Sequence, residues 1–147
     1  MSDLFTLHGQ VIRGKQLGSK LGFPTANIAY DPSAAAWPQD GVYIGIAAIQ
    51  GDGRNYVAIL NQGHHPTAPG GAPTIEAHML GYPNHELYSS YIDLVYCEFL
   101  RPEQTFDSLD ALKDQLALDR KSAIKWAQVH NPKLLFGIDP SLLPIDI

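Results

Sequence analysis

Thr25 and Asn27 stand one residue apart, directly after a glycine-rich stretch of the chain. In an extended segment, alternate side chains point to the same side, so these two would face one ligand together. Their neutral oxygens suit a hard cation such as Mg²⁺, which usually keeps waters and takes substrate phosphate oxygens as further ligands. The pair therefore indicates either a magnesium site that a nucleotide completes or an ordinary hydrogen-bonded strand edge.

The segment from Gly14 to Pro24 could bind phosphate. Glycine allows positive φ values and lets backbone N–H groups approach an anion closely, and lysines add positive charge. The segment lacks the G-x-x-x-x-G-K-[ST] pattern of a P-loop, so a flexible surface loop is the alternative. The candidate binding residues are Gly14, Lys15, Gly18, Lys20, Gly22 and Pro24.

A carboxylate stands in the alternating run TIEAHML, in which Thr74, Glu76 and His78 would share one face of a strand. The run follows a glycine- and proline-rich segment, residues 64–74, that could act as a lid. Glu76 is therefore a candidate general base. The alternative is an ordinary solvated strand face.

Arg101 ends the longest apolar run of the chain and is followed by Pro102, as in a strand-to-helix connection. Asp119 falls near the apolar stripe of the helix expected next, where a buried carboxylate needs a partner. We expect Arg101 to be that partner.

Other catalytic and metal sites are not indicated. The adjacent His64 and His65 would point apart and have no third ligand at a fitting spacing, which disfavours a metal site. Cys97 is the single cysteine, so a disulfide framework and a cysteine-rich zinc site are excluded and a buried core thiol is expected. The G-x-S-x-G motif of serine hydrolases is absent from the sequence.

Short apolar or alternating runs, separated by glycine and proline, predict strands. An Asp-Gly step between two of them, at Asp52 and Gly53, is typical of a hairpin turn. The predicted strands are residues 5–12, 26–30, 41–50, 55–62, 74–80 and 91–100.

Apolar residues change to helical spacing from Ser108 to about Gln128, with Asp107 or Ser108 available as the N-cap. Short strands followed by one amphipathic helix predict an all-β barrel with a C-terminal α-helix packed on it, because closing the sheet removes exposed edges. An open sandwich is the alternative. We expect residues 1–130 to form this domain and residues 131–147 an irregular extension on its surface.

The chain has 147 residues and a formal net charge of −5. This length fits one domain with its own core. The negative charge disfavours nucleic acid as a partner, because phosphate contacts need a basic face. A signal peptide and an apolar run of about 20 residues are both missing, so we expect a cytoplasmic protein without a membrane partner.

Taken in order, these motifs resemble the riboflavin kinase (flavokinase) family, which includes eukaryotic riboflavin kinases and the kinase domain of bacterial bifunctional enzymes. The resemblance runs from about Gly9 to Ala123. The segments that carry it are G-x-V-x-x-G from Gly9 to Gly14, LGFPTAN from Leu21 to Asn27, GVY from Gly41 to Tyr43, N-x-G-x-x-P-T from Asn61 to Thr67, Glu76, Leu87-Tyr88, and LRPE-x-x-F-x-S-L from Leu100 to Leu109.

The resemblance implies a six-stranded Greek-key barrel with a C-terminal helix, and transfer of phosphate from ATP to the 5′-hydroxyl of riboflavin to give FMN and ADP. It implies that the glycine loop holds the nucleotide phosphates, that Thr25 and Asn27 hold Mg²⁺, and that Glu76 is the base. Tyr88 and Arg101 are further expected ligand-binding residues. ATP and riboflavin are the expected partners of a monomeric enzyme.

The sequence departs from the family pattern at three places. Leu17 and Ser19 flank Gly18 where relatives usually keep basic residues, Gln62 and Ala68 replace an isoleucine and an aromatic residue, and Ser89 replaces a common glycine. The altered loop at Leu17 and Ser19 gives the best support for a second interpretation. A catalytically degenerate module that binds flavin or nucleotide for regulation is therefore the alternative function, and a protein-interaction barrel is a third. The resemblance is equally compatible with a free-standing kinase and with one domain of a protein that also contains an FAD-forming adenylyltransferase.

Overall fold

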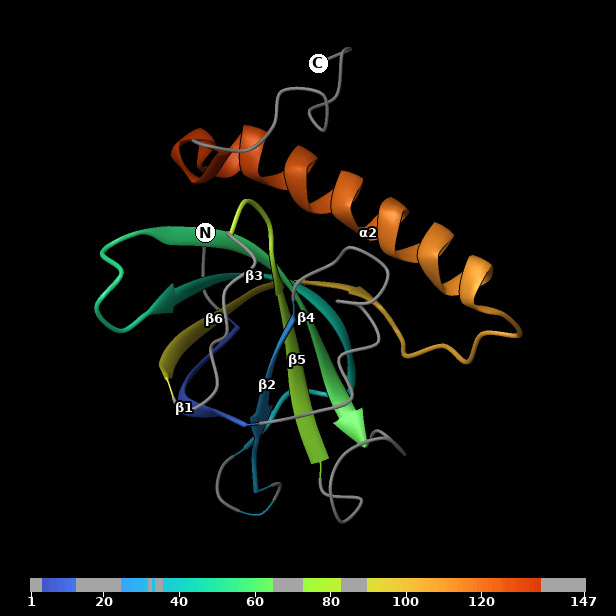
Figure 1. Ribbon diagram of the computed structural model, residues 1–147, viewed down its shortest axis with the longest axis horizontal. Coiled ribbons are helices and arrows are strands. Elements are labelled where there is room, and N and C mark those ends of the chain that lie inside the picture. Colours follow the sequence, from blue (N-terminus) through green and yellow to red (C-terminus); the bar gives the residue numbers. More distant parts are fainter. Residues whose placement is uncertain are drawn as a thin grey trace.

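A computed structural model describes residues 4–12, 25–31, 33, 36–64, 73–82 and 90–135 of the chain. In these residues six antiparallel strands close into a barrel, and a long helix lies across it (Figure 1). The elements are β1 (Phe5–Ile12), β2 (Thr25–Ala29), β3 (Gly41–Ile49), β4 (Asn55–His64), β5 (Pro73–Met79), β6 (Tyr91–Arg101), α2 (Leu109–His130) and the 3₁₀ helix η2 (Pro132–Leu135). The predicted all-β barrel with a C-terminal helix is confirmed.

The strands lie in the order β1-β2-β5-β4-β3-β6, and β1 pairs with β6 to close the ring. Every strand therefore has a hydrogen-bonded neighbour on both sides, which leaves no open sheet edge among the six. Closure rules out the open sandwich. It also places β5 between β4, which precedes it along the chain, and β2, which does not directly precede or follow it.

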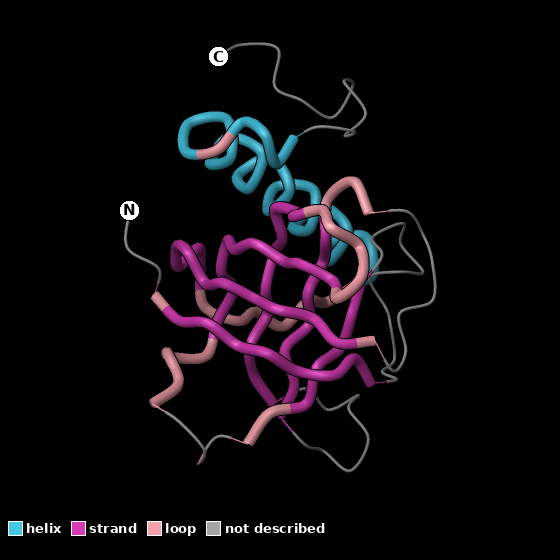
Figure 2. Tube along the Cα trace, turned by 90° about the vertical axis from the view of Figure 1, so that its left-hand side faces the viewer, coloured by secondary structure: helices cyan, strands magenta, loops and turns pink. Residues whose placement is uncertain are grey.

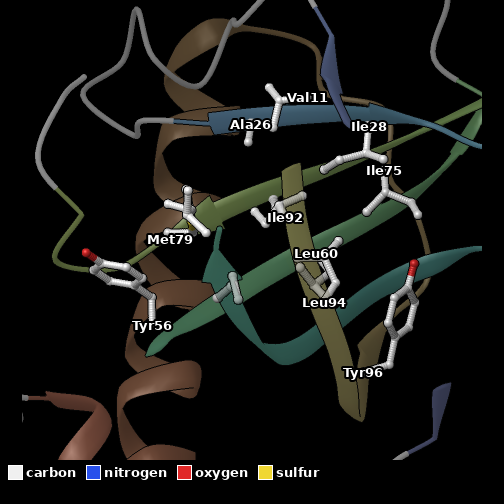
Figure 3. Close-up of a cluster of buried hydrophobic side chains, with 14 of the residues drawn as sticks. Val11, Ala26, Ile28, Tyr56, Leu60, Ile75, Met79, Ile92, Leu94 and Tyr96 are labelled. Carbon is white, nitrogen blue, oxygen red and sulfur yellow. The ribbon is translucent and has the colours of Figure 1, made fainter. Parts of the chain in front are cut away.

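The barrel interior is filled by the inward-facing side chains of all six strands (Figure 3). Alternation along each strand produces this set, because every second residue points inward. The fully buried members include Ile28 of β2, Leu60 of β4 and Ile75 of β5, each 0% exposed. The same alternation turns Asn27, Asn61 and Glu76 to the outer face.

Helix α2 packs on the outer face of β3 and β4. Figure 2 shows the helix at one side of the strands. A second apolar cluster fills this layer, and it includes Cys97, the predicted core thiol. Its buried members are Val42, Ile44, Val57, Ile59, Leu80, Cys97, Ala123, Ile124, Trp126, Ala127 and Leu134.

The ends of α2 follow from local hydrogen bonds. The hydroxyl oxygen of Ser108 accepts a hydrogen bond from the Ala111 N–H at 3.0 Å, which makes Ser108 the N-cap. At the other end, the Asn131 N–H donates to the Ala127 carbonyl at 2.8 Å. The chain then enters η2, where Leu134 is buried against the helix layer.

Strand boundaries differ from the prediction mainly in β4, which continues to His64 rather than ending at Gln62. Its last residues pair with the start of β5, Gly63 with Thr74 and His64 with Pro73. Glycine and proline marked this stretch as irregular in the sequence, but cross-strand hydrogen bonds hold it in the ladder. No helix within the described ranges is both long and apolar enough to span a membrane.

Candidate active site

The predicted magnesium pair and the predicted base lie on adjacent strands. Thr25 pairs with His78, and Asn27 pairs with Glu76, across the β2–β5 ladder. Their flanking residues Ala26 and Ala77 face the barrel core, so the polar side chains face outward. Residues directly opposite in an antiparallel pair have Cβ atoms about 4.5–5.5 Å apart, which brings Asn27 and Glu76 within reach of one ligand.

A third polar residue extends this arrangement onto β4. Asn61 is the partner of Glu76 on the other side of β5, so an amide stands on each side of the carboxylate. We name Asn27, Glu76 and Asn61 the polar row. The sequence placed Asn61 in a family motif but gave it no role, because strand register is not visible in a single sequence.

The row is partly sealed from water. Asn27 is 4% exposed, and Glu76 and Asn61 are half-buried. Thr74 and His78, which flank Glu76 on the same face, are 3% and 6% exposed. The alternative of an ordinary solvated strand face is therefore wrong.

Two amide atoms of the row lack partners. Within the described part of the chain, neither Nδ2 of Asn27 nor Oδ1 of Asn61 makes a hydrogen bond, although both atoms are buried. An unsatisfied buried polar atom costs roughly 1–3 kcal/mol, so proteins rarely keep one without a reason. A bound polar ligand would supply the missing hydrogen bonds.

The donor set of Thr25 and Asn27 fits magnesium only in part. In the described residues no group of three or more His, Cys, Asp or Glu side chains could hold a metal ion. The two side chains offer neutral oxygens from one face of β2, which leaves the remaining coordination to phosphate oxygens and water. The pair is thus suited to an ion that arrives with a nucleotide.

The predicted pair of Arg101 with Asp119 is confirmed. Nε and Nη2 of Arg101 donate to the two oxygens of the Asp119 carboxylate at 3.0 and 2.7 Å. Gln115 donates to the same carboxylate at 3.0 Å, and the Asp119 side chain is only 2% exposed. The guanidinium thus joins β6 to α2, and its expected contact with a ligand stays a prediction.

A second carboxylate lies beside the row. A Cβ atom placed on Gly63 would overlap the carboxylate of Glu103, so Glu103 lies directly over the Gly63 backbone. Gly63 follows Asn61 by two residues on β4 and therefore shares its outer face. Glycine at position 63 leaves room for the Glu103 carboxylate, which any larger side chain there would displace.

Tyr96, Gln62 and Asp40 form a hydrogen-bonded chain next to the core of the barrel. The hydroxyl of Tyr96 donates to Oε1 of Gln62 at 3.0 Å, and Nε2 of Gln62 donates to Asp40 at 3.1 Å. Burial, with a further contribution from Asp40, raises the pKa of Tyr30 to about 12. Burial also raises the pKa of Tyr96. These hydroxyls stay protonated and keep donating at neutral pH.

Several predicted site residues lie outside the described residues, and their roles stay predictions. They are Gly14, Lys15, Gly18, Lys20, Gly22, Pro24 and Tyr88.

Comparison with known proteins agrees with the motif resemblance. The family model for riboflavin kinase (Flavokinase) matches residues 1–127. The bifunctional riboflavin kinase/FMN adenylyltransferase of Escherichia coli (strain K12) is 34% identical over 129 residues, which are 87% of this chain and 40% of that protein. The chain therefore spans about two fifths of the length of this curated relative. Riboflavin kinase of Mus musculus is 32% identical over 124 residues, 82% of this chain and 79% of the mouse protein.

Two solved structures share the fold. A protein of Streptococcus pneumoniae, titled a macrolide-efflux protein, aligns with a TM-score of 0.71 and 27% identity over 85% of this chain and 40% of its own. Riboflavin kinase from Trypanosoma brucei aligns with a TM-score of 0.58 and 23% identity over 90% of this chain and 84% of its own. Since the family model covers most of the chain and the mouse enzyme is matched over most of its length, this chain belongs to the riboflavin kinase family.

Proposed function

We propose that the chain is a kinase that transfers the γ-phosphate of ATP to the 5′-hydroxyl of riboflavin and releases FMN and ADP. Family membership supports the reaction class. The observation that carries the proposal is the register of β2 with β5. Glu76 pairs directly with Asn27, and Thr25, which pairs with His78, is its diagonal neighbour on the same face. A base beside a candidate site for nucleotide-bound magnesium is what phosphoryl transfer to a hydroxyl requires.

In this proposal Glu76 accepts the proton of the attacking hydroxyl. The hydroxyl oxygen forms a bond to the γ-phosphorus while the bond from that phosphorus to the bridging oxygen breaks, and ADP leaves with the electron pair. The half-buried position of Glu76 suits this task, because a fixed carboxylate can meet the hydroxyl in one geometry. The buried side chains of Thr74 and His78 exclude water from the same face.

Thr25 and Asn27 are the proposed holders of Mg²⁺, together with phosphate oxygens of the nucleotide. The bound ion would neutralise charge on the transferring phosphate. The glycine-rich segment before β2 is the proposed phosphate-binding loop. A further module with adenylyltransferase activity, as the name of the Escherichia coli relative indicates, is compatible with this proposal.

The test is to incubate the purified protein with riboflavin, ATP and Mg²⁺ and to separate the flavins by chromatography. We expect FMN to accumulate in proportion to enzyme and to disappear when Mg²⁺ is chelated. Absence of FMN across several nucleotides and divalent metals would contradict the proposal. Flavin or nucleotide binding without any turnover would instead select the regulatory module.

A further inference from the structure

The surroundings of Asn61 restrict what its side chain can contact. Across the ladder on one side stands Val42 of β3, which is 1% exposed and apolar. On the same face of β4, Ile59 is buried and apolar, and Gly63 has no side chain. Of the two cross-strand partners of Asn61, only Glu76 on β5 is polar. The amide of Asn61 can therefore make polar contacts on the Glu76 side of the row or with a molecule bound above it.

Oδ1 of Asn61 is buried and has no hydrogen-bond partner among the described residues. An ionised carboxylate only accepts hydrogen bonds, so the Glu76 side chain cannot satisfy an oxygen acceptor. A hydroxyl group can, because it donates one hydrogen bond and accepts others. If the amide turns about its last bond, its N–H₂ group takes the same place and donates to a hydroxyl oxygen instead.

The two amides of the polar row lie on opposite sides of the base. Asn27 is on β2, beside Thr25 and the proposed nucleotide site, whereas Asn61 is on β4, on the other side of β5 (Figure 1). The Glu103 carboxylate over Gly63 adds a second acceptor to the β4 side. A chain with several hydroxyl groups matches this side, because each hydroxyl can both donate and accept.

We propose that Asn61 is a substrate-positioning residue that binds the hydroxyl-bearing ribityl chain of the acceptor and holds it beside Glu76. This inference rests on the proposed function and adds the side of the base on which the acceptor binds. Asn61 takes no proton. It fixes the polyol chain so that the terminal hydroxyl meets the Glu76 carboxylate.

The test compares two flavins that differ in the ribityl chain. Riboflavin has this chain, and lumiflavin has a methyl group in its place. Binding of each to the wild-type protein and to Asn61→Ala is measured by quenching of flavin fluorescence. We expect the variant to bind riboflavin about three- to tenfold more weakly, the effect of one lost hydrogen bond, and to bind lumiflavin as the wild type does.

Kinetics supply the second readout. In Asn61→Ala we expect the KM for riboflavin to rise and kcat to fall, with the KM for ATP unchanged. Asn61→Ser, which keeps a group able to donate and accept, should recover part of the loss. Asn55→Ala is the matched control, because Asn55 is an exposed asparagine at the far end of the same strand and should leave every value unchanged.

Three results would overturn the inference. Unchanged riboflavin binding and kinetics in Asn61→Ala would exclude the contact. Equal loss of affinity for riboflavin and lumiflavin, or for ATP as well, would indicate a structural role, which the thermal unfolding midpoint of each variant would reveal independently. A wild-type protein that neither binds riboflavin nor makes FMN would defeat the proposed function, and the inference with it.

Discussion

At the scale of single residues, Glu76 stands between two neutral amides, Asn27 and Asn61, on neighbouring strands. Glutamine has the same shape but cannot take a proton. We therefore expect Glu76→Gln to lower kcat for FMN formation by about 10²- to 10⁴-fold, the usual contribution of a general base. Chromatography of the flavins measures the rate, and the thermal unfolding midpoint should remain that of the wild type.

Glu98→Gln is the control for this variant. Glu98 is an exposed carboxylate on β6, and its replacement should leave the rate unchanged. Full activity of Glu76→Gln would remove Glu76 from the role of base, even if the wild-type protein makes FMN.

Tyr30 predicts a stability effect in alkaline solution. The pKa of its hydroxyl rises from 10.0 in the unfolded chain to about 12 in the fold, so the folded protein holds this proton more tightly. The unfolded chain releases the proton first as the pH rises. Stability from Tyr30 is complete below pH 10 and is lost between pH 10 and about 12.

Tyr30→Phe should weaken this loss. Other tyrosines with a raised pKa, including Tyr96, also contribute to it, so we expect a shallower decline rather than none. Thermal unfolding of both proteins below and above pH 10 measures the difference. Identical pH profiles of stability would show that folding does not raise the pKa of the Tyr30 hydroxyl.

At the scale of elements, the Arg101–Asp119 pair joins the end of β6 to the middle of α2. Removing one partner leaves the other charge partly buried without compensation, which typically costs about 3–5 kcal/mol. We expect Asp119→Ala to lower the free energy of unfolding by about 3 kcal/mol, measured by urea denaturation. Asp114→Ala, at an exposed position of the same helix, should have little effect.

A double variant separates pairing from packing. Replacing both partners with apolar residues of similar size, as in Arg101→Met with Asp119→Leu, should recover much of the stability because no unpaired charge remains. If Asp119→Ala alone unfolds no more readily than the wild type, the pair does not hold α2 on the barrel.

The elements themselves could be predicted because each leaves a local pattern. A long apolar run marked β6, and Asp107 and Ser108 marked the start of α2 as the two candidate N-caps. The polar row could not be predicted in full, since it depends on the pairing of β5 with both β2 and β4. The pairing of Asn61 with Glu76 depends on closure of the whole sheet, and the residues around Asn61 do not indicate it.

At the scale of the whole molecule, closure depends on the tight contact of β3 with β6. A Cβ atom at Gly45 would lie against the Val95 carbonyl oxygen and 2.6 Å from Cδ1 of Leu60. Overpacking of this kind costs about 1–3 kcal/mol, so Gly45→Ala should reduce the free energy of unfolding by that amount. Gly53→Asn is the control, because its backbone has φ of 61°, which asparagine tolerates, and its surroundings are open.

The contact of Gly45 with β6 could not be predicted from the sequence, where Gly45 appears inside an otherwise apolar strand.

Urea denaturation of Gly45→Ala and Gly53→Asn measures the effect of each substitution on the free energy of unfolding. A Gly45→Ala protein as stable as the wild type would mean that β3 and β6 can separate slightly without loss.

The pairing of β1 with β6 has a consequence for how the protein forms. Phe5 pairs with Tyr96, which is 91 residues further along the chain (96 − 5). One side of β1 therefore stays unpaired until β6 has been synthesised. Contacts this distant along the chain make folding slow. On the ribosome, β2, β4 and β5 can emerge and begin to pair, yet the ring around Glu76 stays open until residues 91–101 have left the exit tunnel.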